Sequence, residues 1–188
     1  MARARAESQG GNWALCYDSS TDCTACPSAT YNWNGHSYCS CPSGSTSFHG
    51  GCDAYNQTVV IGHNSLGFTF GGFAQATWAG NRDGDNWARE AAGDFLFRLG
   101  PGATPVAYRP TGKDTSYHYG DSRNWPAWGQ YDAWGYNDLQ FGYYFALGQG
   151  YYTQCDQGGT YAGKPNDACG GHRNWGATEM EVWYRVGS

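Results

Sequence analysis

Two short stretches, Thr58-Val-Val-Ile61 and Phe68-Thr-Phe-Gly-Gly-Phe73, decide the fold of this 188-residue chain, and Asn64-Ser-Leu-Gly67 lies between them. The first stretch is β-branched and the second mixes aromatic with small residues, which are compositions that suit strands. The connecting Asn, Ser and Gly are typical turn residues. The pattern therefore predicts a β-hairpin near the middle of the chain.

Further strands are predicted at residues 95–99, 106–109, 139–147 and 179–186. In the last of these, alternate residues share a face, so one face should belong to the core. That face carries Met180, Val182, Tyr184 and Val186. A short helix is predicted over 85–92, because Asp85 can cap good helix formers that end at Gly93. Together these elements predict a mostly β (α+β) fold, a two-sheet antiparallel β-sandwich with short helices.

The composition fits one domain with an aromatic core. Aliphatic residues are few, but 9 Trp and 15 Tyr are present, and each large ring buries roughly 150–250 Å². We expect residues 1–12 to form a tail and residues 13–188 to form a single domain. The net charge of -5, with no basic cluster, argues against nucleic acid as a partner. No apolar run is long enough to span a membrane, and the first residues lack the apolar core of a signal peptide.

Cysteines concentrate between Cys16 and Cys52, in a stretch with neither helical nor strand periodicity that we expect to be irregular. Four of them, together with His36, resemble a zinc knuckle, but the Cys39-x-Cys41 spacing is unusual for zinc. Disulfides would account for all of the cysteines, although their spacing does not determine which cysteines pair with each other. We expect Cys155 to pair with Cys169, because no other cysteine lies in that part of the chain. The cysteines assigned to disulfides are Cys16, Cys23, Cys26, Cys39, Cys41, Cys52, Cys155 and Cys169.

Disulfides indicate an oxidising compartment, so we expect a secreted, extracellular protein. A glycosylation sequon at Asn56-Gln57-Thr58 agrees with secretion in a eukaryote, although such tripeptides also arise by chance.

Several segments, in order, resemble the TLDc domain family. They are Trp13-Ala-Leu-Cys-Tyr17, Phe48-His49, Cys52-Asp53, Thr58-Val-Val-Ile61, Phe70-Gly-Gly-Phe73 with Trp78, Asp94-Phe-Leu-Phe97, Leu139-Gln-Phe-Gly142 and Glu179-Met-Glu-Val-Trp183. The resemblance implies a β-sandwich with short flanking helices, and a family linked to oxidation resistance and to binding the proton-pumping vacuolar ATPase. It supplies no established catalytic residues. This chain departs from the pattern by a cysteine-rich insertion at about 19–47 and by Cys155 and Cys169, which favour an extracellular branch.

An aromatic loop is the candidate ligand site. Exposed rings beside carboxylates and amides are a common way to hold the faces of sugars. The competing interpretation is that these rings fill the aliphatic-poor core. The candidate ligand-binding residues are Asp121, Asn124, Trp125, Trp128, Tyr131, Asp132 and Trp134.

Two pairs of acidic residues are candidates for metal binding or catalysis. Asp83 and Asp85 lie in an oxygen-rich turn that could bind calcium, or could simply cap the following helix. Glu179 and Glu181 share the outward face of the last strand and could form a glycosidase-like carboxylate pair, or could be solvated. We find no catalytic motif, so we do not expect an enzyme.

The expected function is a secreted, disulfide-stabilised recognition module that binds glycans through the aromatic loop. A different class, a structural component of an extracellular coat or matrix that self-assembles, is the alternative. A glycoside hydrolase using Glu179 and Glu181 is the third hypothesis.

Overall fold

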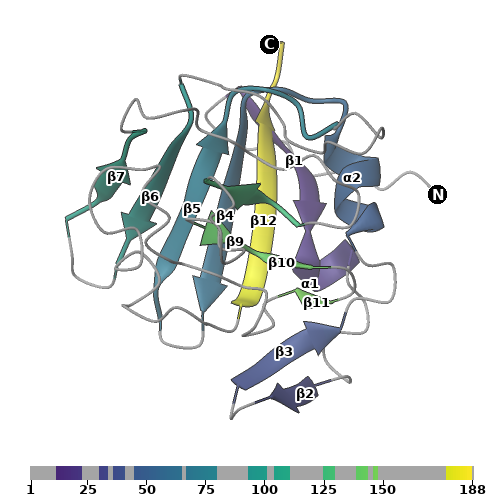
Figure 1. The fold of residues 1–188 in the computed structure, drawn as a ribbon. Coiled ribbons are helices and arrows are strands. Elements are labelled where there is room, and N and C mark those ends of the chain that lie inside the picture. The colour runs from purple at the N-terminus through teal and green to yellow at the C-terminus, as the bar shows by residue number, and fades with distance from the viewer. Residues whose placement is uncertain are drawn as a thin grey trace.

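The computed structural model of this protein is built around one large antiparallel sheet (Figure 1). It describes residues 12–22, 30–33, 36–40, 45–64, 67–79, 93–100, 104–110, 125–129, 139–143, 146–147 and 177–187. The six strands of the large sheet lie in the order β1 (Trp13–Asp18), β12 (Ala177–Arg185), β4 (Thr58–Asn64), β5 (Thr69–Ala74), β6 (Phe95–Leu99) and β7 (Val106–Tyr108). The first and last strands therefore lie side by side, because β1 pairs with β12 at one side of the sheet.

Two smaller sheets and two short helices accompany the large sheet (Figure 1). One small sheet has the order β10 (Gly142–Tyr143), β11 (Ala146–Leu147), β3 (His36–Ser40) and β2 (Thr30–Trp33). The other pairs β8 (Ala127–Trp128) with β9 (Leu139–Gln140). The helices are α1 (Ser19–Asp22) and α2 (Thr46–Cys52). The predicted fold class, a two-sheet antiparallel β-sandwich with short helices, is confirmed.

The predicted central hairpin is formed by β4 and β5. Strand β4 alternates strictly between buried and half-buried residues, so one of its faces lies in the core. The turn is held by Asn64, whose side-chain Oδ1 accepts the backbone N–H of Phe68 at 3.0 Å and whose carbonyl accepts that of Gly67 at 3.0 Å. Gly67 has a φ of 81°, a left-handed conformation that glycine adopts without a steric penalty.

Aromatic rings form a layer over the inner face of the large sheet, and two glycines make room for it. A Cβ at Gly72 would lie 2.7 Å from the indole of Trp128, and a Cβ at Gly62 would lie 2.3 Å from the ring of Phe141. Trp128 and Phe141 contact each other with centroids 6.4 Å apart, and both are completely buried. These two glycines of the hairpin therefore leave space for aromatic rings to pack directly against the strand backbone.

Strand β12 follows its predicted alternation except at the end. Met180 and Val182 are completely buried and Tyr184 packs against the core, as expected. Val186 is 51% exposed, so its assignment to the core face was wrong. The physical reason is that β12 ends at Arg185 and the chain turns there, with Gly187 at a φ of 80°.

The stretch from Cys16 to Cys52 is more regular than predicted. It contains α1, the β2–β3 hairpin and α2, so the expectation of an irregular region was wrong. In the hairpin, Trp33 pairs with His36, so only Asn34-Gly35 connects the two strands. Asn-Gly is the dipeptide most typical of two-residue hairpin connections, and that signal outweighs the missing alternation. The single strand predicted over 139–147 is instead divided into β9, β10 and β11, while the helix predicted over 85–92 lies outside the described residues.

Replacing Gly72 with alanine should lower the free energy of unfolding by about 1–3 kcal/mol, because the added methyl group overpacks a buried ring that has nowhere to move. Gly50→Ala is the matched control: a Cβ there meets nothing within 4 Å, and alanine favours helix α2 by up to about 1 kcal/mol. Chemical denaturation of both variants measures the difference. Equal stabilities would show that Trp128 does not rest on Gly72.

Candidate functional site

The described part of the aromatic loop is core rather than surface. Trp125 and Trp128 are completely buried, so neither ring can stack on a ligand, and the expectation that these two belong to an exposed site was wrong. The Trp125 ring centroid lies 5.6 Å from that of Tyr17 and 6.4 Å from that of Phe48. Trp128 meets Trp78 edge to face at 5.2 Å. In a chain with few aliphatic side chains, these rings supply the interior packing.

Backbone bonds hold the same segment in place. The N–H of Trp125 donates to the carbonyl of Gly142 at 3.3 Å, and the N–H of Phe141 donates to the carbonyl of Pro126 at 3.0 Å. Residues 125–129 are therefore fixed to the core by both rings and backbone. The remaining residues of the predicted site lie outside the described part of the chain; they are Asp121, Asn124, Tyr131, Asp132 and Trp134.

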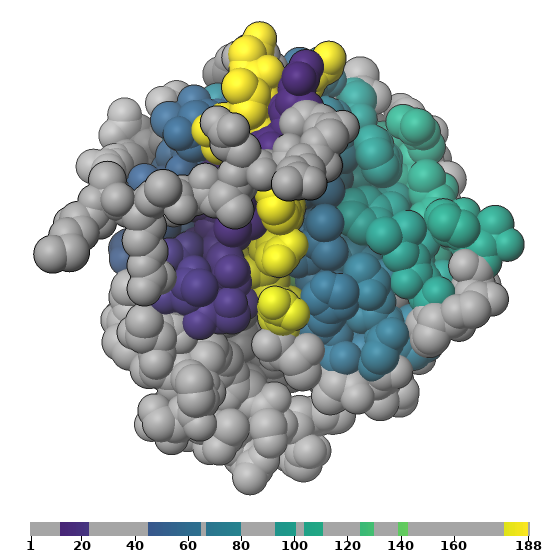
Figure 2. Space-filling view, turned by 180° about the vertical axis from the view of Figure 1, so that it is seen from behind, coloured from purple at the N-terminus to yellow at the C-terminus, as the bar shows by residue number. Residues whose placement is uncertain are grey.

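The opposite face of the large sheet forms a second candidate surface, which the sequence analysis did not identify as a site. Cross-strand pairing places one residue from each of five neighbouring strands in a row, and we call this set the outer row. The outer row consists of Leu15, Trp183, Val59, Phe73 and Phe95. All five are only half-buried, and nearby Leu99 is 45% exposed. Seen from behind, the strands form a broad face on which β1, β12, β4, β5, β6 and β7 are visible (Figure 2).

Polar groups lie at both ends of the outer row. The guanidinium of Arg109 lies over the ring of Phe95, 5.0 Å from its centroid, as in a cation–π contact. At the other end, the indole N–H of Trp183 donates to Glu181 Oε2 at 2.9 Å. Pairing also places Glu179 opposite His63 and Glu181 opposite Asp18. The exposed Arg185 also lies on this face of β12, two residues after Trp183. The face is therefore apolar in its centre, with Arg109 at one end and side chains of both charges at the other.

Glu179 and Glu181 lie on this outer face, as the alternation predicted, and both are half-buried. Glu181 is already engaged with the indole of Trp183. Two carboxylates on a broad sheet face are suited to accepting hydrogen bonds from a bound molecule. Hydrolysis of a glycoside would require an acid and a base on opposite sides of the scissile bond.

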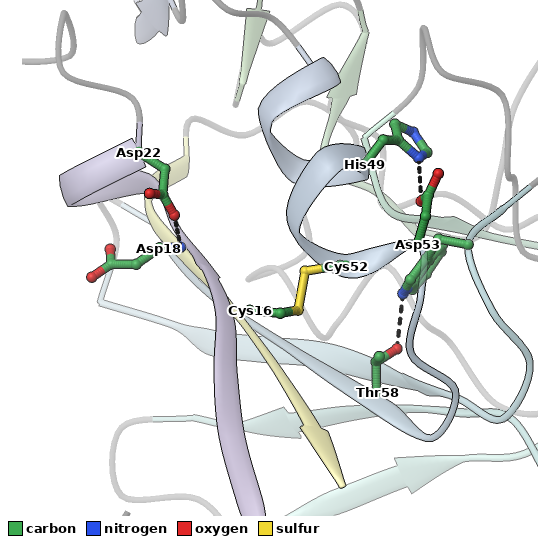
Figure 3. Close-up of a disulfide and its surroundings, with 8 residues drawn as sticks. Cys16, Asp18, Asp22, His49, Cys52, Asp53 and Thr58 are labelled. Carbon is green, nitrogen blue, oxygen red and sulfur yellow. Dashed lines mark hydrogen bonds and ion pairs between the residues drawn. A yellow bond between two sulfur atoms is a disulfide. The ribbon is translucent and has the colours of Figure 1, made fainter. Parts of the chain in front are cut away.

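A disulfide links β1 to α2 at the edge of the large sheet (Figure 3). Cys16 and Cys52 are bonded with an S–S distance of 2.00 Å, and both are buried. This confirms the structural role predicted for these two cysteines and selects their pairing, which the spacing could not. For the other six cysteines, including Cys155 and Cys169, no side chain is among those described.

Hydrogen bonds surround this disulfide (Figure 3). His49 Nδ1 lies 2.7 Å from Asp53 Oδ1, and the indole N–H of Trp78 donates to Thr58 Oγ1 at 2.8 Å. Burial raises the pKa of the Tyr17 hydroxyl well above its usual range, and the carboxylates of Asp22 and Asp18 raise it further. Tyr17 is therefore a neutral core residue rather than an acid–base group.

The described residues bear on three further features: metal binding, glycosylation and membrane spans. Within those ranges, no group of three or more His, Cys, Asp or Glu side chains is placed to hold a metal ion. Asp83 and Asp85 lie outside them. Asn56 is half-buried in the bend before β4. None of the helices in the described part of the chain is long and apolar enough to cross a membrane.

In a comparison with protein families, the model of the TLDc domain matches residues 24–185. The match begins inside the cysteine-rich stretch and runs to the end of β12. No curated protein matches this chain.

Replacing both Cys16 and Cys52 with alanine should lower the free energy of unfolding by about 4 kcal/mol, because the bridge closes a loop with a sequence separation of 36. Denaturation without reductant measures the loss. In excess reductant the wild type should lose the same advantage, and the difference between the two proteins should nearly vanish. A difference below about 1 kcal/mol without reductant would show that the bridge does not constrain the chain.

Proposed function

The chain belongs to the TLDc domain family, and from this premise we propose that it is a secreted, non-catalytic recognition module that binds glycans. The Cys16–Cys52 disulfide supports the extracellular location, since buried disulfides persist in oxidising compartments and are rare in the cytosol. For the same reason we do not carry over the intracellular proton-pump association that the family resemblance implies.

The observation that carries the glycan proposal is the anchoring of residues 125–129. Two buried indoles and two backbone hydrogen bonds hold this segment to the core. Asn124 directly precedes it, and Tyr131, Asp132 and Trp134 follow within five residues. Binding groups attached to a rigid base lose less conformational entropy when a ligand is bound. We propose that Tyr131 and Trp134 stack on the sugar and that Asp121, Asn124 and Asp132 form hydrogen bonds with it.

The outer face favours a second candidate function, a component of an extracellular coat or matrix. An apolar strip that crosses five strands is more than a lone exposed hydrophobic residue, and contiguous patches of this kind mark interaction surfaces. A coat protein would use this face for cohesion, while a soluble lectin would not need it. The two functions depend on different residues, so they can be tested separately.

Replacing Trp134 or Tyr131 with alanine should weaken glycan binding by about 10- to 100-fold, because a stacking ring commonly contributes about 1–3 kcal/mol. A glycan array with wild-type protein identifies the ligand, and titration with each variant measures the loss. Val186→Ala is the control, since that side chain is exposed and lies at the end of β12.

The array is read with and without calcium, and Asp85→Asn is included to test a contribution of Asp83 and Asp85. No binding to any glycan by the folded wild type, or full binding by both ring variants, would contradict the proposal. Turnover of a bound glycoside that is lost in Glu179→Gln or Glu181→Gln would instead support the hydrolase hypothesis.

Alkylation of the folded protein without reductant should label none of its eight cysteines, because a secreted domain of this kind is expected to hold all of them in bridges. Intact mass before and after alkylation counts the labelled thiols. Labelling of four cysteines between residues 23 and 41 would favour zinc in that region, and labelling of Cys155 and Cys169 would remove the predicted second bridge.

A further inference from the structure

We propose that Tyr55 and Tyr184 are a site of oxidative modification, at which the two phenol rings become joined covalently as dityrosine. The observation that carries the proposal is the stacking of the two rings, whose centroids lie 3.7 Å apart and whose planes are inclined by only 9°. Aromatic pairs usually prefer offset or edge-to-face arrangements with centroids about 4.5–7 Å apart. These two rings are therefore closer and more nearly face to face than aromatic packing alone favours. Neither tyrosine is among the residues assigned to glycan binding, so the proposal is independent of that function.

Hydrogen bonds hold the two segments that carry these rings. The backbone N–H of Tyr55 donates to the carbonyl of Cys52 at 3.0 Å, at the end of α2. The carbonyl of Gln57 accepts the backbone N–H of Arg185 at 3.1 Å, and Gln57 Oε1 accepts the Arg185 guanidinium at 3.2 Å. Arg185 directly follows Tyr184, so the two segments are tied together within two residues of each ring. The stacked arrangement is therefore set by the fold before any reaction occurs.

Both rings of the pair are partly accessible to solvent. Tyr55 and Tyr184 pack against the core, yet each residue is only half-buried. Tyr17 and Tyr108, by contrast, are buried. A small oxidant in solution reaches a half-buried phenol more readily than a buried one, so it acts on the stacked pair before it acts on these two core tyrosines.

The coupling removes one electron and one proton from each phenol. The oxidant is one molecule of hydrogen peroxide, which a haem peroxidase reduces to two molecules of water with these electrons and protons. Each phenoxyl radical carries unpaired electron density on the ring carbons beside its oxygen, the Cε atoms, in orbitals perpendicular to the ring. Face-to-face stacking directs these orbitals toward the neighbouring ring, and a bond forms between a Cε of Tyr55 and a Cε of Tyr184. Each bonded carbon then loses its proton and each oxygen regains one, so that both phenols are restored.

The new bond joins the segment between α2 and β4 to strand β12. The Cys16–Cys52 disulfide already joins α2 to β1, the neighbour of β12 in the sheet. The two bridges therefore connect the region around α2 to both strands at this side of the sheet. They differ in chemistry, because a reductant opens a disulfide but leaves a carbon–carbon bond intact.

Treatment of the dilute, folded protein with hydrogen peroxide and a haem peroxidase tests the site. A digest of the monomeric product should contain a fluorescent cross-linked peptide that joins Tyr55 to Tyr184 and lacks two hydrogen atoms relative to its parts. Tyr55→Phe and Tyr184→Phe each keep a stacking ring but remove the phenol, so each should abolish this peptide. Tyr108→Phe is the matched control, since Tyr108 is buried on β7 at the far side of the sheet, and it should leave the peptide unchanged.

The same treatment in urea separates the folded geometry from chance encounters in the chain. The yield of the peptide that joins Tyr55 to Tyr184 should fall by about tenfold or more, because unfolding removes the high effective concentration of the two rings. Coupling of free N-acetyltyrosine shows that the peroxidase is active under each condition, and circular dichroism shows that each variant is folded; one folded Phe variant suffices. Folded wild-type protein that yields no such peptide while N-acetyltyrosine is coupled would overturn the proposal. So would an equal yield in urea.

Discussion

The structure depends on the fit between aromatic rings and the glycines of the central hairpin. Gly72 and Gly62 lack side chains at the points where Trp128 and Phe141 meet the sheet, so the rings approach the backbone directly. From there the contacts continue through Trp78 and Phe48 to Tyr17 and Trp125. A chain with few aliphatic residues obtains a close-packed interior in this way, because each ring buries a large area at a small cost in side-chain entropy.

This inner layer gives the sheet two unlike sides. On the inner side the rings are completely buried and hold segment 125–129, which the proposed glycan-binding residues flank in the sequence. On the outer side the outer row remains half-buried. The Cys16–Cys52 bridge ties β1, the edge strand that carries Leu15 of the outer row, to α2. One sheet therefore carries a completely buried aromatic layer on one side and a half-buried apolar row on the other.

Local patterns allowed much of the fold to be predicted, and long-range contacts account for what was missed. The β4–β5 hairpin, β6 and the buried face of β12 follow from β-branched runs, turn residues and alternation near them in the chain. The sequence offered both burial and exposure of Trp125 and Trp128 and could not decide between them. Pro126 and Gly129 favour a surface loop, whereas the rings pack against Gly72, Phe48 and Tyr17, which are far away in sequence. The outer row was missed for a similar reason, because its members lie on different strands and meet only through the register of the sheet. By contrast, the dipeptide Asn34-Gly35 is a local signal for the β2–β3 hairpin, but the surrounding cysteines led us to expect an irregular region.

The most direct test of the central claim is a double-mutant cycle between Gly72 and Trp128. Trp128→Phe creates a cavity and is destabilising alone, but the smaller ring should accept the methyl group of Gly72→Ala. If Trp128 rests on Gly72, the double variant should be at least about 1 kcal/mol more stable than the sum of the single effects implies. Additivity within about 0.5 kcal/mol in chemical denaturation would show that the ring and the glycine are not in contact, and would contradict the account.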